Sequence, residues 1–103
     1  MRVTGEELRQ QTDFTMYGSL WFAYVDSKGT GVRMIDLRGR RHRHIGSRKI
    51  TPKGEVMTQY EDSQHRGQRI YSVWKRKGKY QFILPNGHLG PWYTTKPGNP
   101  EKL

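Results

Sequence analysis

Short segments rich in aromatic and β-branched residues recur along this chain, and turn signals separate them. Several segments alternate apolar with polar residues, which is typical of β-strands with one buried face. The pattern predicts strands at Met16–Val25, Val32–Leu37, Arg41–Ile45, Glu55–Tyr60, Arg69–Lys75, Lys79–Leu84 and Trp92–Thr95. The first is a continuous apolar run, so we expect it to be buried on both faces. The large side chains expected mostly in the core are Trp21, Phe22, Phe82 and Ile83.

Pairs of a polar residue and a glycine lie between these segments. They are Lys28-Gly29, Arg38-Gly39, Lys53-Gly54, Arg66-Gly67, Lys77-Gly78 and Asn86-Gly87. Glycine adopts the positive φ that tight hairpin turns require, and regularly spaced turns favour an antiparallel meander, sandwich or barrel. We therefore predict a mainly β fold, either a small antiparallel sheet or a partly open barrel of the SH3-like or OB-like type.

The two ends of the chain carry different signals. Thr4-Gly5-Glu6-Glu7 has the spacing of a capping box, in which a Thr side chain caps the helix and a Glu reaches back to the cap amide. It predicts a short N-terminal helix at Gly5–Gln11, anchored by Leu8. The segment Lys96–Leu103 is rich in Pro and Gly and is expected to be a flexible tail. Residues 1–95 are then a single basic β domain.

Composition limits the class of protein. The chain has 103 residues, 32% of them hydrophobic, which suits one domain with a small core. It has no Cys, so disulfides and thiolate metal sites are excluded. No signal-peptide pattern and no apolar run of about 20 residues is present, so we expect a cytoplasmic protein. Because Walker and Rossmann motifs are also missing, no cofactor is expected.

Positive charge is concentrated in the second part of the chain. The net charge is +10, with −1 in residues 1–36 and +11 in residues 37–103. The stretch Leu37–Gly54 has seven cations and no carboxylate: Arg38, Arg40, Arg41, Arg43, Arg48, Lys49 and Lys53. A second cluster, Lys75, Arg76, Lys77 and Lys79, is flanked by Trp74 and Tyr80. Such self-repelling clusters are typical of surfaces that bind phosphate.

These clusters predict a nucleic-acid-binding protein. On a strand, alternation would place Arg41 and Arg43 on one face, where they could contact successive phosphates. Trp74 and Tyr80 could stack on bases, which slightly favours RNA or single-stranded DNA over duplex. The alternative for these two rings is that they pack on each other as cross-strand partners. His42 and His44 have the spacing of a metal-binding β pair, but the surrounding cations disfavour a metal, and none is expected.

Two other functions stay open. One is a protein-interaction module, an inhibitor or assembly factor that docks on an acidic protein surface. The other is a small metal-independent ribonuclease, in which Asp62, His65 and Arg69 would supply acid–base and cationic groups. The pieces Asp62–His65 and Asn86–Gly90 resemble, in part, the ribosome-cleaving colicin ribonuclease domains, and that resemblance implies a small toxin-like nuclease. Where that family continues with a catalytic Glu after the His, this chain has Arg66-Gly67-Gln68-Arg69. Enzymatic activity is the less favoured interpretation.

Overall fold

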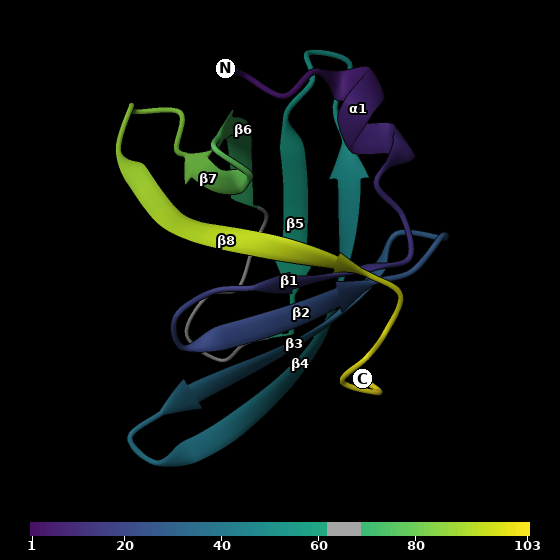
Figure 1. The fold of residues 1–103 in the computed structure, drawn as a ribbon, viewed down its shortest axis with the longest axis vertical. Coiled ribbons are helices and arrows are strands. Elements are labelled where there is room, and N and C mark those ends of the chain that lie inside the picture. Colours follow the sequence, from purple (N-terminus) through teal and green to yellow (C-terminus); the bar gives the residue numbers. More distant parts are fainter. Residues whose placement is uncertain (62–68) are drawn as a thin grey trace.

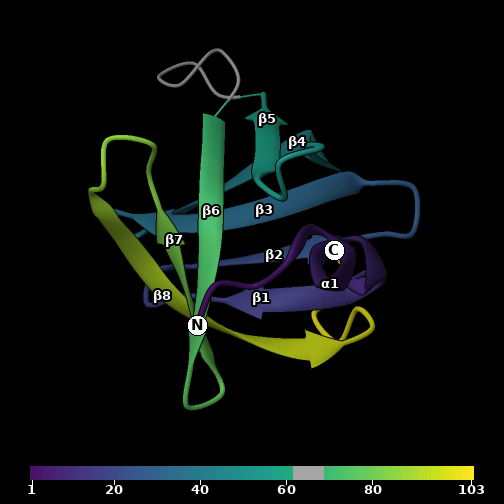
Figure 2. The ribbon, with the colours of Figure 1, turned by 90° about the horizontal axis from the view of Figure 1, so that it is seen from above.

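The computed structural model describes residues 1–61 and 69–103. It contains one helix and eight strands: α1 Gly5–Gln10, β1 Phe14–Tyr17, β2 Trp21–Val25, β3 Thr30–Leu37, β4 Arg40–Ile50, β5 Val56–Tyr60, β6 Arg69–Arg76, β7 Lys79–Ile83 and β8 Leu89–Pro97. Each strand pairs antiparallel with the next, and β8 pairs back to β1, so the sheet is a closed barrel (Figures 1 and 2). The predicted mainly β fold with a short N-terminal helix is confirmed. Among the described residues, no helix is long and apolar enough to cross a membrane.

Two of the predicted boundaries are wrong. The apolar run Met16–Val25 is not one strand: β1 and β2 are joined by a hairpin, closed by a hydrogen bond from Gly18 N to Trp21 O (2.8 Å). Apolarity alone gave no sign of this turn, because both strands face the core. At the other end, β8 continues through Lys96 and Pro97, which pair with Thr15 and Phe14 of β1. These two residues therefore belong to the barrel and not to the tail.

The helix forms where the capping pattern predicts it. The side chain of Thr4 accepts a hydrogen bond from Glu7 N (3.2 Å), which satisfies a free amide of the first turn. The Thr4 hydroxyl also donates to the Glu7 carboxylate (3.2 Å), so Glu7 reaches the cap side chain and not the cap amide. Leu8 is fully buried, and Arg9 donates to Thr51 O beside the β4–β5 turn. The helix thus covers one end of the barrel.

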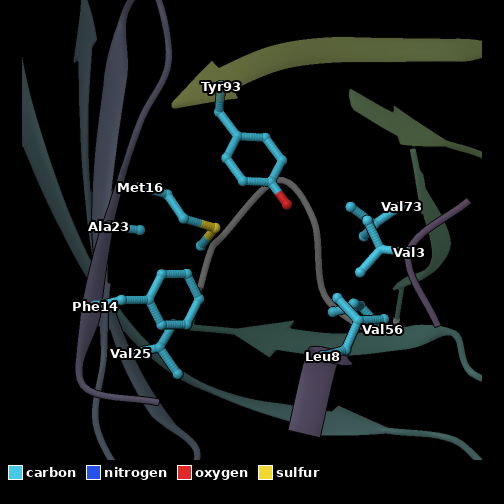
Figure 3. Packing of buried hydrophobic residues seen from close by; sticks show 9 residues of the cluster. All are labelled: Val3, Leu8, Phe14, Met16, Ala23, Val25, Val56, Val73 and Tyr93. Atoms are coloured by element: carbon cyan, nitrogen blue, oxygen red, sulfur yellow. The ribbon is translucent and has the colours of Figure 1, made fainter. Parts of the chain in front are cut away.

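The hydrophobic core lies inside the barrel and includes Leu8 of the helix (Figure 3). It consists of Val3, Leu8, Phe14, Met16, Ala23, Val25, Val56, Val73 and Tyr93. Trp21 and Phe82 pack against this cluster, as expected. Phe22 and Ile83 do not join it, because each is next in sequence to an inward-facing residue and so points outward. Phe22 instead stacks on Tyr17, with ring centroids 6.3 Å apart on the outer surface.

Consecutive hairpins of an up-and-down barrel lie at alternate ends. The β2–β3, β4–β5 and β6–β7 turns lie at the end that α1 covers, which we call the helix end. The β1–β2, β3–β4 and β7–β8 turns lie at the other, the open end. Figure 1 shows the β3–β4 hairpin standing out from the barrel on the side opposite α1. This alternation decides which basic segments lie together.

Candidate nucleic-acid interface

The strongly basic stretch forms most of a projecting β-hairpin. We call this β3–β4 hairpin, with the four cations Arg38, Arg40, Arg41 and Arg43 in and near its turn, the basic hairpin. Arg38 and Gly39 form the turn with φ of 51° and 76°, the geometry that suits a two-residue hairpin. Arg41 and Arg43 pair with Asp36 and Met34 on the outer face of β4. Four cations are therefore displayed on one exposed ribbon.

Alternation along β4 separates Arg41 and Arg43 from the histidines. His42 and His44 lie on the opposite face, with their rings 6.4 Å apart and nearly parallel. In the part of the chain that the structure describes, no group of three His, Asp or Glu side chains comes together. Arg41 pairs with Asp36 at 3.2 Å, and both side chains are exposed, so this ion pair contributes little to stability. Among the described residues, the other three cations of the basic hairpin have no carboxylate partner.

Arg48 is a predicted phosphate contact that the structure places inside the barrel. Its guanidinium lies 5.3 Å from the centre of the Phe14 ring, and its Nη1 donates to Gln11 O at 3.4 Å. Burial lowers the pKa of Arg48, although the nearby hydroxyls of Tyr93 and Tyr60 act in the opposite direction. Arg48 thus ties α1 to the barrel and is not free to contact a phosphate. Its neighbour Lys49 points outward and is exposed.

The second predicted cluster surrounds the β6–β7 turn. Lys77 and Gly78 have φ of 52° and 78°, so the predicted tight hairpin is present. Arg76 and Lys79 are cross-strand partners, and both are exposed. The Lys75 ammonium lies 5.5 Å from the centre of the Tyr80 ring. The cations of this turn are therefore displayed at the helix end of the barrel.

Trp74 and Tyr80 lie on opposite faces of this hairpin. Tyr80 pairs with Lys75 and stacks on Tyr93 of the core at 5.4 Å, so it points inward. Trp74 pairs with Gln81, points outward and is 42% exposed. The two rings can therefore neither pack on each other nor form one stacking platform. The two-residue turn at Lys77-Gly78 fixes this register, so the alternative that paired the two rings does not agree with the hairpin predicted from the sequence.

The strand register places Trp92, and not Tyr80, on the same face of the sheet as Trp74. Trp92 pairs with Gln81 from the other side and is 43% exposed, so two tryptophans flank one amide on the outer surface. Gln81 is only 8% exposed and donates to Gly90 O at 3.1 Å. Trp74 Nε1 donates to Ser72 Oγ at 3.3 Å, which restrains the first indole. We call this surface, with its adjacent cations, the indole face: Trp74, Arg76, Lys79, Gln81 and Trp92.

A β-bulge in β8 prevents simple alternation from predicting the face on which Trp92 lies. Gln81 pairs with Trp92 and Ile83 with Leu89, so both Gly90 and Pro91 oppose Phe82 alone. A Cβ on Gly90 would lie 2.9 Å from Phe82 O, which favours glycine at this close approach. Pro91 has no amide to donate and fits the interrupted ladder. The extra residue shifts the alternation of β8, so the face of Trp92 could not be read from the sequence.

The two basic clusters do not form one surface. The basic hairpin lies at the open end, whereas the turn of Lys75–Lys79 lies at the helix end. A nucleic acid that contacts both would have to run along the outside of the barrel. The indole face places two exposed indoles close to the cations Arg76 and Lys79.

Of the three residues of the ribonuclease alternative, the structure describes Arg69. Asp62 and His65 lie outside the described residues. Arg69 begins β6, pairs with Thr58, and is exposed at the open end of the barrel. Comparisons of the chain with models of protein families, with curated proteins and with solved structures find no match.

Proposed function

We propose that the protein binds single-stranded nucleic acid, RNA or DNA, on the indole face. Bases would stack on Trp74 and Trp92, and phosphates would be held by the cations of the β6–β7 turn. The observation that carries the proposal is the placement of two exposed tryptophans on either side of Gln81, next to Arg76 and Lys79. Aromatic rings beside a cationic track are the usual means of binding single strands without sequence preference.

The spacing of the two indoles supports this geometry. With strands ~4.8 Å apart, residues two strands apart lie about 10 Å from each other on the same row. Two rings at this distance, with the nearly buried Gln81 between them, can each meet a separate unpaired base. A paired base inside a duplex would not expose its ring in this way. The indole face therefore favours single strands.

Charge on this side of the barrel is uniformly positive. From Arg69 to Pro97 the chain has six cations and no carboxylate. Arg2 pairs with Trp74 in an isolated bridge and extends the row of the indoles by one more cation. A phosphate backbone that follows this row would meet no repulsive charge from β6, β7 or β8, and counterion release would favour binding.

The basic hairpin supports a different contact. A two-stranded β-ribbon has dimensions that fit the major groove of a duplex, and Arg41 and Arg43 point outward from this one. If the basic hairpin were the main binding site, duplex DNA would bind at least as well as single strands. The preference between the two kinds of nucleic acid therefore distinguishes the two surfaces.

Fluorescence anisotropy tests the proposal directly. Labelled single-stranded RNA, single-stranded DNA and duplex DNA of equal length would be titrated at several salt concentrations, and then run on a denaturing gel. We expect single strands to bind more tightly than duplex and to stay intact. Binding of no nucleic acid at physiological salt would contradict the proposal and favour an acidic protein partner. Shortened RNA would favour the ribonuclease.

A further inference from the structure

The barrel contains a cavity that the core does not fill. Its volume is about 240 Å³, and it lies at the open end, away from α1. The lining residues come from the strand ends there: Trp21 begins β2, Tyr60 ends β5, and Leu84 follows β7. Eight-stranded barrels have an interior just wide enough either to be filled by side chains or to hold one small ligand. Here the helix end is filled and the open end is not.

One part of the cavity wall is apolar and aromatic. Trp21 and Phe82 stack with centroids 6.4 Å apart, and Tyr71 contacts Phe82 at 4.8 Å. Ile35 completes this part of the wall on β3. Such a surface favours a flat or flexible hydrocarbon group, because burying it removes apolar area from water.

The rest of the wall is polar and positively charged. Arg33 and Arg69 both line the cavity, and no carboxylate lines it among the described residues. The Arg33 guanidinium lies 4.3 Å from the centre of the Tyr60 ring and 3.4 Å from His44 Nδ1, so its position is well defined. The hydroxyls of Tyr71 and Thr58 are 2.9 Å apart on the same wall. Guanidinium and hydroxyl groups together are typical of a carboxylate site.

Tyr60 owes its position to two glycines. A Cβ on Gly46 would lie 2.7 Å from its ring, and a Cβ on Gly31 would lie 2.9 Å from its hydroxyl. Gly31, Gly46 and Tyr60 are on one inward row of β3, β4 and β5. The ring therefore lies across the sheet at a place from which larger residues would exclude it. The Arg33 guanidinium packs over the face of this ring. This arrangement preorganises the charged part of the cavity.

We propose that this cavity is a second binding site, for a small monocarboxylate with an apolar body. The hydrocarbon would pack on Trp21, Phe82 and Ile35, and the carboxylate would bind Arg69 at the rim, with Arg33 and the hydroxyls adjacent. At ~30 Å³ per water, the volume corresponds to about eight waters, which is the size of a ligand with roughly ten non-hydrogen atoms. The site is on the inside of the barrel and is independent of the indole face.

Isothermal titration with sodium octanoate tests the site, with the uncharged octanamide as the matched ligand. We expect saturable binding of octanoate and at least tenfold weaker binding of octanamide. Arg69→Leu should weaken octanoate at least tenfold. Arg76→Leu, at the other end of the same strand and on the outer face, should leave octanoate binding unchanged. Ile35→Phe, which narrows the cavity without a change in charge, should abolish the binding of both ligands.

The tryptophans allow a second readout. In the double variant Trp74→Phe and Trp92→Phe, Trp21 is the only tryptophan of the chain, so its fluorescence should change as octanoate binds. Absence of binding to the wild-type protein would overturn the proposal. So would equal effects of Arg69→Leu and Arg76→Leu, or equal affinity for octanoate and octanamide. Nucleic-acid binding should be unchanged by octanoate, so failure at one site leaves the other testable.

Discussion

Trp74 and Trp92 lie on one outward row of the barrel, separated by the strand that carries Gln81 between them. Each is about two-fifths exposed, although the chain has few large apolar side chains with which to build a core. With a core this small, leaving two indoles on the surface gives up the stabilisation that their burial would contribute. The binding function that we propose for that surface would account for their exposure, since an exposed aromatic cluster is typical of an interaction site.

Removing one indole should weaken single-strand binding and leave the fold intact. Stacking of a base on an aromatic side chain is worth about 1–3 kcal/mol, so Trp74→Ala or Trp92→Ala should reduce affinity about tenfold. Phe at either position should recover part of the loss. Anisotropy gives the affinity, and circular dichroism checks the fold. An unchanged affinity in both Ala variants would exclude stacking on this face.

Charge removal should show which basic surface binds phosphate. The double variant Arg76→Gln and Lys79→Gln should lower the slope of log K against log salt by nearly one unit for each phosphate that the protein no longer neutralises. The matched variant Arg41→Gln and Arg43→Gln removes the same charge from the basic hairpin. We expect it to have the smaller effect on single strands. The reverse order would move the site to the basic hairpin.

The sequence predicted the elements of this fold better than their faces. Alternation and X-Gly turns placed the hairpins at Arg38-Gly39 and Lys77-Gly78, since both signals are local. The turn at Lys77-Gly78 also fixes Gln81 as the cross-strand neighbour of Trp74. The place of Trp92 beside Gln81 could not be found in this way, because it depends on pairing between β7 and β8 across a bulge. Arg48 looked like its exposed neighbours in composition, and only closure of the barrel shows that it faces inward. The cavity likewise depends on which inward rows meet, so no single segment predicts it.

Leu8 should anchor the helix to the barrel. It is fully buried and is the apolar contact of a six-residue helix that is too short to be stable alone. Leu8→Ala should lower the free energy of unfolding by about 2–5 kcal/mol, as for other buried leucines. Urea denaturation measures this loss. Leu20→Ala, at a site that is 60% exposed, is the control and should change stability by less than about 0.5 kcal/mol. A similar effect of both variants would mean that α1 is not docked through Leu8.

Stability should fall in alkaline solution because of buried tyrosines. Burial raises the pKa of Tyr93 well above its ordinary value, and the charge of Arg48 offsets this only in part. Burial also raises the pKa of Tyr60. Below about pH 10 each phenol is neutral in both the folded and the unfolded state, so neither affects the pH dependence. Above that pH the unfolded chain loses protons that the folded protein retains, and unfolding is favoured by about 1.4 kcal/mol per pH unit for each tyrosine.

Comparison of the wild-type protein with Tyr93→Phe isolates this effect. Urea denaturation between about pH 9 and pH 11 should give a steep loss of stability in the wild type. Above about pH 10 the slope in Tyr93→Phe should be smaller, by a difference that approaches about 1.4 kcal/mol per pH unit as the unfolded phenol ionises, because one of the linked protons is gone. Deprotonation of surface lysines affects both proteins alike and cancels in the difference. Parallel slopes would show that the hydroxyl of Tyr93 ionises as readily in the folded barrel as in the unfolded chain, which its 4% exposure argues against.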